Sequence, residues 1–375
     1  MFGEAHGSKE LGNLSADLFE HLVRSGLVDT LALEYVMDAN PSIDTYLETG
    51  VGPLVSVYHF DRMSPNDFAR LLLERARRLR KEGFAIRAFA VDYPWDLHGL
   101  NERITAIAER LSAEQKALAL GTMPAAPPGL SPNVDADFVA SAEAYDQHIA
   151  ENRATICSAL DEPMCEELMM LARALWIGAF AASGAVSYST NEQFAHFVGA
   201  REDLIYYNFR AHLTSGHERV YAHMGLAHTM KGDPAFGFDA VAGRLDKQFP
   251  PTLGRVFSTR QDCGPGSKVL YGGSIEKEAT EFEDIASALA HEPLATHVVP
   301  TNDPSAMCVA NPVADLPISS CSERCGDVYD AIVFLRLLTP DDGLALRSTS
   351  ADLRRALHQL DKVRAAEAKL LQPRH

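Results

Sequence analysis

Hydrophobic positions in the first hundred residues follow two periods, one typical of helices and one typical of short buried strands. Apolar residues recur on one helical face over residues 11–23 and again over residues 68–79. A glycine follows each stripe, Gly26 and Gly83, as is common at helix C-termini. Ser8 stands where an N-cap is expected. The pattern predicts two amphipathic helices packed on a core.

Short apolar runs lie between these helices and return in the second half of the chain. The expected strands cover residues 30–35, 85–91, 219–223, 253–258 and 331–335. Helices between strands at this spacing favour a mostly parallel central sheet flanked by helices. The sequence therefore predicts an α/β fold.

The middle of the chain has almost no strand signal. Residues 100–213 show helical stretches, interrupted by the Pro/Gly-rich segment 124–129. We expect a large all-helical insertion that acts as a cap. The predicted division is a discontinuous α/β core of residues 1–100 and 214–345, a helical cap of residues 101–213, and a C-terminal helix in residues 346–375.

Composition and net charge exclude several classes of protein and one class of partner. Of the 375 residues, 46% are hydrophobic and 23% are charged, which is typical of globular proteins and excludes disordered, collagen-like and coiled-coil chains. Lys and Arg number 34 against 51 Asp and Glu, so the net charge is 34 − 51 = −17. Such a surface repels phosphate backbones, so we expect no nucleic-acid partner.

Targeting signals and cysteine use favour a cytoplasmic protein. No stretch approaches the roughly 20 apolar residues that span a bilayer, so no membrane association is expected. The first residues lack the basic and apolar regions of a signal peptide. The six cysteines do not show the paired spacing of a zinc site, and we expect reduced, structural thiols.

Polar residues gather where the predicted strands end. Residues 3–10 read Gly-Glu-Ala-His-Gly-Ser-Lys-Glu, Glu34 and Asp92 end the next two strands, and His223 and His228 belong to the fourth strand and its turn. Ligands bind parallel sheets beyond the carboxyl ends of their strands, so these groups are candidates for one site. Structural alternatives stay open: Glu34 could form a salt bridge or cap a helix, and Asp92 could begin a turn.

The same residues resemble the erythromycin esterase family. The segment 3–10 resembles the opening motif of that family, and residues 31–34 resemble its second strand with an acidic end. Arg201, followed by an acid and a later Asn, matches a further family element. Residues 220–223 resemble the histidine-bearing strand, and residues 329–334 the closing strand. The resemblance spans nearly the whole chain.

The resemblance implies a hydrolase that cleaves an ester or lactone with a histidine-activated water. His6 would be the general base, since an imidazole titrates near neutral pH. Glu4 or Glu34 would orient it, and His223 or His228 would stabilise the oxyanion or donate a proton to the leaving group.

Substrate binding is assigned to three further groups, Glu10, Asp92 and Arg201. The resemblance points to a small-molecule ester or lactone, such as a macrolide, and so to antibiotic resistance. No Gly-x-Ser-x-Gly element occurs at a strand end, which favours direct attack by water without a cofactor.

One departure from the esterases is that one residue fewer separates Glu4 from His6. The resulting Gly-x-x-His spacing also occurs in Tiki/TraB-type and haem-uptake proteins, and Gly225-x-x-His228 would be a second copy. Three alternatives therefore remain. The first is a metal-dependent hydrolase holding a divalent metal through His6, Glu34 and His228, the second is a non-enzymatic haem- or ligand-binding protein, and the third is a structural or inactive protein.

Overall fold

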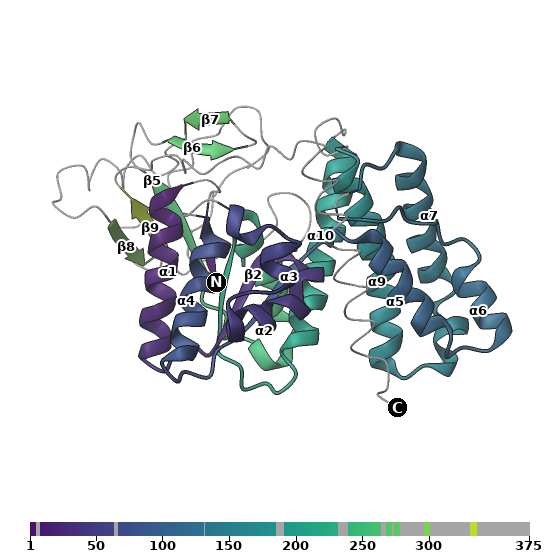
Figure 1. Ribbon diagram of the computed structural model, residues 1–375, viewed down its shortest axis with the longest axis horizontal. Coiled ribbons are helices and arrows are strands. Elements are labelled where there is room, and N and C mark those ends of the chain that lie inside the picture. The colour runs from purple at the N-terminus through teal and green to yellow at the C-terminus, as the bar shows by residue number, and fades with distance from the viewer. Residues whose placement is uncertain are drawn as a thin grey trace. The chain divides into compact units, whose positions relative to one another are not determined.

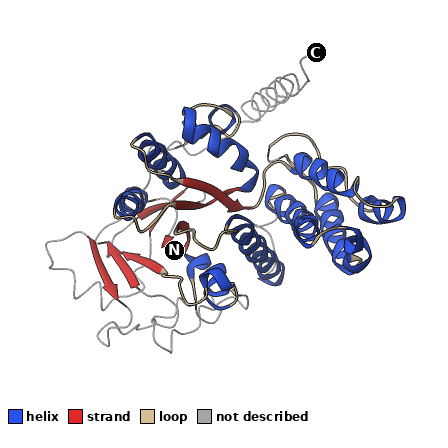
Figure 2. Ribbon diagram, turned by 90° about the horizontal axis from the view of Figure 1, so that it is seen from below, coloured by secondary structure: helices blue, strands red, loops and turns tan. Residues whose placement is uncertain are grey.

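The computed structural model of the chain contains a mostly parallel sheet with helices on both of its faces (Figures 1 and 2). The structure describes residues 1–4, 8–63, 67–130, 132–184, 191–231, 239–263, 268–271, 274–277, 296–300 and 331–335. These residues form two compact units. The first comprises residues 1–35, 39–91 and the described residues from 209 onward, and the second comprises residues 36–38 and 92–208. The α/β class predicted from the sequence is confirmed.

The sheet has seven strands in the order β3-β2-β4-β1-β5-β9-β8. They are β1 (Phe2–Glu4), β2 (Thr30–Val36), β3 (Arg87–Asp92), β4 (Val220–Gly225), β5 (Thr259–Cys263), β8 (Thr296–Pro300) and β9 (Ala331–Leu335). Strand β4 pairs in parallel with both β1 and β2, whereas β8 pairs with β9 antiparallel. The short strands β6 (Lys268–Tyr271) and β7 (Ser274–Lys277) form a separate antiparallel pair.

The register of the three central strands places the polar residues at their ends along one edge of the sheet. Glu4 at the end of β1 lies opposite Gly225 at the end of β4, and Leu33 on β2 lies opposite His223. Extended by one residue, this register places Glu34 opposite Met224, next to Gly225. Because parallel strands end at the same edge, residues far apart in sequence meet there.

The helices of the first unit form as their caps and apolar faces predict. They are α1 (Lys9–Arg24), α2 (Asn40–Thr49), α3 (Pro53–Ser56), α4 (Phe68–Lys81), α11 (Val241–Lys247) and the last turn of α10 (Asn191–His212). Ser8 caps α1 and Asp67 caps α4 through their side chains. Gly26 and Gly83 follow these two helices with positive φ values of 69° and 99°, which glycine adopts without strain.

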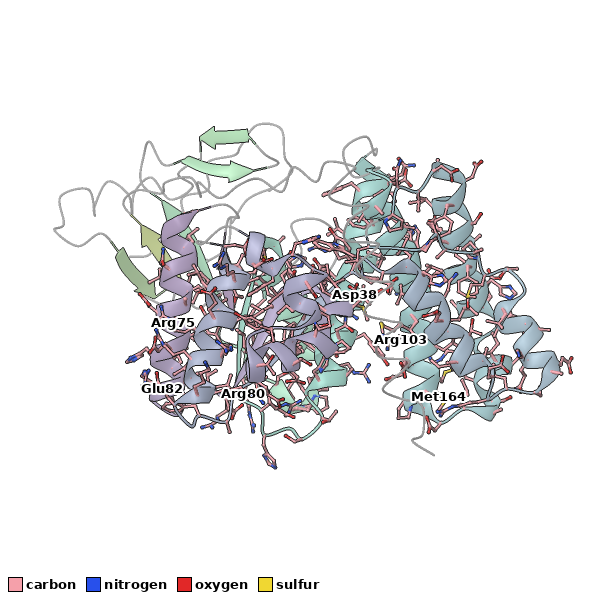
Figure 3. The ribbon with its side chains drawn as sticks, in the orientation of Figure 1. Asp38, Arg75, Arg80, Glu82, Arg103 and Met164 are labelled. Atoms are coloured by element: carbon pink, nitrogen blue, oxygen red, sulfur yellow. A yellow bond between two sulfur atoms is a disulfide. The ribbon has the colours of Figure 1, made fainter. Side chains whose placement is uncertain are left out.

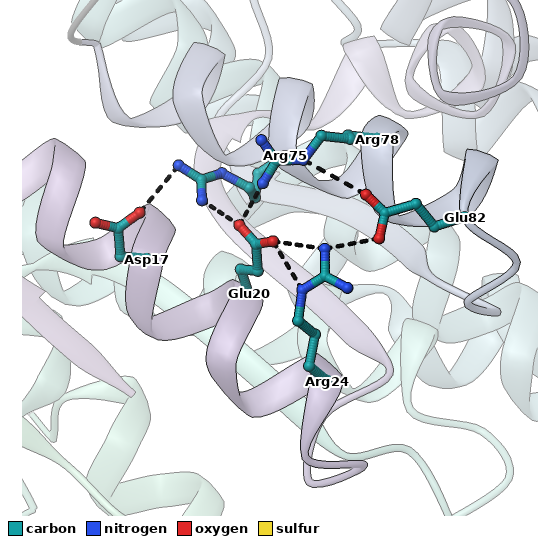
Figure 4. A network of polar contacts seen from close by, with 6 residues as sticks. All are labelled: Asp17, Glu20, Arg24, Arg75, Arg78 and Glu82. Carbon is teal, nitrogen blue, oxygen red and sulfur yellow. Dashed lines mark hydrogen bonds and ion pairs between the residues drawn. The ribbon is translucent and has the colours of Figure 1, made fainter.

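Helices α1 and α4 lie side by side and are joined by a network of charges (Figure 4). Glu20 on α1 is at its centre and pairs with Arg24, Arg75 and Arg78. Arg75 also pairs with Asp17 at 3.0 Å. The basic residues of α4 are thus partly neutralised by α1.

One side chain occupies the edge of the sheet. Asn40, the first residue of α2, donates its amide to the carbonyl oxygen of Ala90 at 3.0 Å and accepts from the Ala90 amide at 2.6 Å. Ala90 belongs to β3, the first strand in the sheet order. The side chain therefore takes the place that a neighbouring strand would occupy.

The second unit is built from helices. They are α5 (Leu97–Ala108), α6 (Ala113–Leu120), α7 (Ala136–Glu151), α8 (Arg153–Ile156), α9 (Glu162–Ala182) and most of α10. Its core joins α5, α7 and α9 through buried side chains such as Ile104, Tyr145 and Leu175. On the surface, Arg103 of α5 pairs with Glu167 of α9 at 2.8 Å (Figure 3). Within the described residues, no helix combines the length and apolar character that a bilayer crossing requires.

Cys157 and Cys165 form a disulfide, so the expectation of reduced thiols is wrong for this pair. Asp161 caps α9 and directs the chain back, which brings the two Cα atoms to 5.3 Å. Two lone cysteines eight residues apart do not predict this pairing, because it depends on the turn between α8 and α9.

Expected and observed elements differ most after β4. The expected strand over residues 253–258 is wrong: these residues form a turn and loop, and β5 begins at Thr259. Gly254 has a φ of 63°, which is incompatible with a continuous strand. The expected strand at residues 331–335 is confirmed as β9. The expected C-terminal helix lies outside the described residues.

Candidate functional site

A buried carboxylate and a buried imidazole meet at the carboxyl edge of the sheet in the first unit. The Oε1 atom of Glu34 lies 3.2 Å from Nε2 of His228, and the two side chains are only 6% and 5% exposed. The other oxygen of Glu34, Oε2, accepts a hydrogen bond from the backbone amide of Gly225. Both carboxylate oxygens are therefore engaged, which fixes the orientation of the carboxyl group.

The backbone after β4 brings His228 to this position. The strand ends at Gly225, and the 3₁₀ turn η5 (Leu226–Thr229) follows at once. Gly3 on β1 allows η5 to approach closely, because a Cβ atom there would overlap the Thr229 hydroxyl and lie 2.8 Å from the Thr259 carbonyl oxygen. Gly3 thus has a packing role next to the Glu34–His228 pair.

His223 lies deeper, inside the core between the sheet and helices α1 and α4. It is fully buried and stacks against the rings of Phe68 at 4.3 Å and Phe2 at 5.6 Å. Its Nδ1 atom lies 2.5 Å from the Ser15 hydroxyl, which in turn lies 2.8 Å from the Tyr221 hydroxyl. Side chains alternate along a strand, so Tyr221 and His223 share the face that α1 covers.

The Tyr221 phenol in this chain of hydrogen bonds is neutral at ordinary pH. Burial raises the pKa of Tyr221, and the hydrogen bond with Ser15 lowers it only in part. A neutral phenol, a hydroxyl and an imidazole can each donate and accept, so a chain of hydrogen bonds can run from Tyr221 through Ser15 to Nδ1 of His223. The sequence analysis missed Ser15, although a serine within an apolar helical stripe is a signal for such a buried contact.

Two of the predicted substrate-binding residues meet in the second unit. Arg201 on α10 makes a two-pronged salt bridge to Asp92 at the end of β3, with distances of 2.8 and 2.7 Å. The guanidinium also lies over the ring of Tyr93 at 5.4 Å. Both charged side chains are mostly covered, at 18% and 11% exposure. This pair is rigid, since two parallel hydrogen bonds and a ring contact hold it.

Asp38 is a further polar residue of the second unit that the sequence analysis missed. Its two carboxylate oxygens accept hydrogen bonds from the backbone amides of Trp95 and Asp96, each at 3.1 Å (Figure 3). It follows β2 by two residues, so its place at a strand end is the same signal that singled out Glu34. Asp38 therefore organises the loop that enters α5.

The remaining predicted site residues cannot be placed in the same way. His6 and the side chains of Glu4 and Glu10 lie outside the part of the chain that the structure describes. Within the described part, no three His, Cys, Asp or Glu side chains gather in a group that could hold a metal ion. The predicted metal set of His6, Glu34 and His228 includes His6, so it stays a prediction.

Comparison with known proteins adds information on the fold. No family model matches the chain, and no curated protein matches it by sequence. Its structure is similar to a Bacillus cereus protein solved by structural genomics, with a TM-score of 0.57, 13% identity and coverage of 92% of this chain and 89% of that one.

Two other solved structures are similar over comparable lengths. One is a histidine mutant of the erythromycin esterase EreC in its open conformation, with a TM-score of 0.60, 11% identity and 91% coverage of both chains. The other is described as a succinoglycan biosynthesis protein, with a TM-score of 0.56, 11% identity and coverage of 90% of this chain and 87% of that one. The chain thus has the fold of these proteins, one of which is an erythromycin esterase, over about nine-tenths of its length.

Proposed function

We propose that the chain is a hydrolase that cleaves a carboxylic ester or lactone, with Glu34 and His228 in its catalytic centre. The observation that supports this most is the buried Glu34–His228 pair at the carboxyl edge of a parallel sheet. Catalytic groups of open α/β sheets lie at this edge. The likeness to the fold of an esterase favours the same class of reaction.

The hydrogen bonds of Glu34 assign a role to each nitrogen of His228. A carboxylate only accepts hydrogen bonds, so the Nε2 atom that faces Glu34 carries a proton. In a neutral ring the other nitrogen, Nδ1, is then the basic one. Glu34 would hold this tautomer and stabilise the imidazolium that forms when Nδ1 takes a proton.

The proposed reaction follows general acid–base catalysis. His6, which follows β1 by two residues, takes a proton from water while the water oxygen attacks the carbonyl carbon. The C–O bond of the tetrahedral intermediate then breaks, and the alkoxide leaves with a proton from an imidazolium. His228, oriented by Glu34, provides that proton or stabilises the oxyanion. The products are a carboxylic acid and an alcohol, or a hydroxy acid from a lactone.

Asp92 and Arg201 are proposed to serve substrate binding as a preformed pair. Their mutual salt bridge fixes the guanidinium, so a substrate would meet an ordered group with little entropy left to lose. An Arg201→Lys variant keeps the charge but loses the two-pronged geometry. We expect it to raise KM more than it lowers kcat.

A mass-spectrometric hydrolysis screen of macrolactones and acyl esters tests the proposal. His6→Ala should abolish turnover with an unchanged thermal transition. His228→Asn should also abolish turnover, at a temperature below its lowered thermal transition, where the variant is folded, and His98→Asn serves as the matched control. His98 lies on the surface of α5, 3.5 Å from Glu102. Turnover that survives His228→Asn would remove this residue from the mechanism. A parallel assay with a chelator, together with metal analysis of the purified protein, separates the metal-dependent alternative.

A further inference from the structure

A small pocket lies in the helical unit, where α7, α8, α9 and α10 all border it. Its volume is about 220 Å³, and its lining includes neither Glu34 nor His228. Sites for drug-sized ligands occupy about 300–1,000 Å³, so this pocket suits a smaller molecule, of the size of an amino acid.

Arg173 of α9 lines this pocket between two carboxylates. Its Nε atom donates to Oδ2 of Asp146 on α7 at 3.4 Å, and its Nη1 atom donates to Oδ2 of Asp203 on α10 at 2.5 Å. The third nitrogen, Nη2, makes no hydrogen bond within the described part of the chain. The side chain is 35% exposed, and Nη2 is not among its buried atoms. A donor with a positive charge is therefore open to a ligand.

Asp146 presents an open acceptor in the same pocket. Its side chain is only 10% exposed, and one oxygen, Oδ2, accepts from Arg173. The other oxygen, Oδ1, has no hydrogen-bond partner among the described residues, yet it retains accessible surface. Burial raises the pKa of Asp146, and the charge and hydrogen bond of Arg173 offset this only in part. A further positive charge beside Oδ1 would thus stabilise the ionised carboxyl group.

The two open atoms differ in character and belong to side chains that contact each other. A ligand that used both would need a cationic donor next to an anionic acceptor. An α-amino acid has this arrangement, because its ammonium and carboxylate groups are bonded to one carbon. Each contact would be a hydrogen bond between charged groups, which is about twice as strong as one between neutral groups.

The rest of the lining is mostly apolar. Met169 and Met170 of α9 and Leu204 and Tyr207 of α10 complete one wall, and methionine side chains adapt readily to the shape of a ligand. An aliphatic side chain would lose its contact with water against this wall. The two other lining residues, Arg153 and Glu166, carry opposite charges and leave the charge balance unchanged.

This pocket is distinct from the Asp92–Arg201 pair. Asp203 and Arg201 both belong to α10 but are two residues apart. With 3.6 residues per turn, their side chains leave the helix about 160° apart, on different faces. A ligand held by Arg173 would therefore not replace the salt bridge of Arg201.

We propose that this pocket binds a free α-amino acid with an aliphatic side chain. The ammonium group donates to Oδ1 of Asp146, the carboxylate accepts from Nη2 of Arg173, and the side chain lies against Met169, Met170 and Leu204. The site does not depend on the proposed hydrolase activity, because the two share no residue.

Three probes with the same branched carbon chain test the proposal by isothermal titration calorimetry at neutral pH. They are leucine, 4-methylpentanoate, which lacks the ammonium group, and 3-methylbutylammonium, which lacks the carboxylate. We expect leucine to bind at least about tenfold more tightly than either of the others, because only leucine makes both charged contacts. Equal binding of either analogue, or no binding of leucine, would overturn the proposal.

A substitution of the acceptor tests where leucine binds. Asp146→Asn should weaken leucine at least about tenfold, whereas the control Asp137→Asn, an exposed aspartate on the same helix, should leave its affinity unchanged. Thermal scans will show whether Asp146→Asn is folded, and a folded variant with the affinity of wild type would contradict the site.

A second variant keeps both charged groups and does not rely on Asp146→Asn being folded. Met169 is partly exposed, so Met169→Trp should fill part of the pocket and weaken leucine at least about fivefold. Leucine that binds Met169→Trp as tightly as wild type would lie elsewhere on the protein, and the proposal would be wrong.

Discussion

Removing either member of the Glu34–His228 pair should destabilise the first unit, and the two effects should be strongly coupled. In Glu34→Gln, the one carbonyl oxygen of the side chain faces only one of the two N–H groups that now donate to the carboxylate. The other donor is left facing an NH₂ group. A buried donor without a partner costs about 1–3 kcal/mol, and loss of the charge adds to this, so we expect about 2–4 kcal/mol.

The second variant, His228→Leu, has no side-chain donor and leaves a buried carboxylate with one fewer partner. The Gly225 amide still donates to Glu34, so the cost should lie near the lower end of the range for a broken buried pair, at about 3 kcal/mol. In the double variant the contact is already absent. Its destabilisation should therefore be smaller than the sum of the single effects by about 2 kcal/mol, a typical value for a charged hydrogen bond.

Urea unfolding followed by circular dichroism measures these differences without knowledge of the substrate. The control cycle combines Glu34→Gln with His148→Gln, since His148 belongs to the helical unit and bonds to the Leu118 carbonyl oxygen at 2.9 Å. That cycle should be additive within about 0.5 kcal/mol. Additive effects in the Glu34–His228 cycle as well would show that the two side chains do not contact each other in solution, and the proposed centre would lose its basis.

Three further predictions concern packing, charge and the disulfide. Gly3→Ala should lower the free energy of unfolding by about 1–3 kcal/mol, because the added methyl overlaps Thr229; a wild-type midpoint in urea would contradict the close approach. Glu20→Gln should cost about 1 kcal/mol at neutral pH and low salt, as expected for a surface network. Burial raises the pKa of Glu20, but its arginine partners lower it overall, so this contribution is present above about pH 4.5 and is lost as the pH falls through the lowered pKa. Thermal scans of wild type and variant should therefore converge in acid, and a gap that persists there would refute the network. Reduction of the Cys157–Cys165 bond, which closes a loop with a separation of eight residues, should cost about 2.5 kcal/mol. Peptide mapping that finds both thiols free in the purified protein would contradict the bond.

Periodicity and strand-end chemistry account for much of what the sequence could predict. The apolar run at 331–335 coincides with β9, because a short run of branched residues has few alternatives to a buried strand. The strand expected at residues 253–258 is absent for a local reason. Gly254 takes a positive φ, and residue types alone do not reveal this conformation. Glu34 and His228 were singled out separately, and the strand register explains how they meet.

Other features depended on geometry that no local pattern contains. His223 sits two residues before the end of β4, so strand alternation turns it into the core against Phe68, whereas His228 lies beyond the strand end. The partner of Asp92 is 109 residues away on helix α10. Such pairings are set by how helices pack, which the spacing of apolar residues constrains only loosely.

The contact between Asn40 and Ala90 has a consequence for how copies of this chain meet. An outermost strand with free amides and carbonyls can recruit a strand from a second molecule, which leads to aggregation. Here a side-chain amide already saturates both main-chain groups of one residue of that strand, so an incoming chain cannot form a continuous ladder along it. A single asparagine thereby discourages intermolecular strand addition at this border without adding any charge to it.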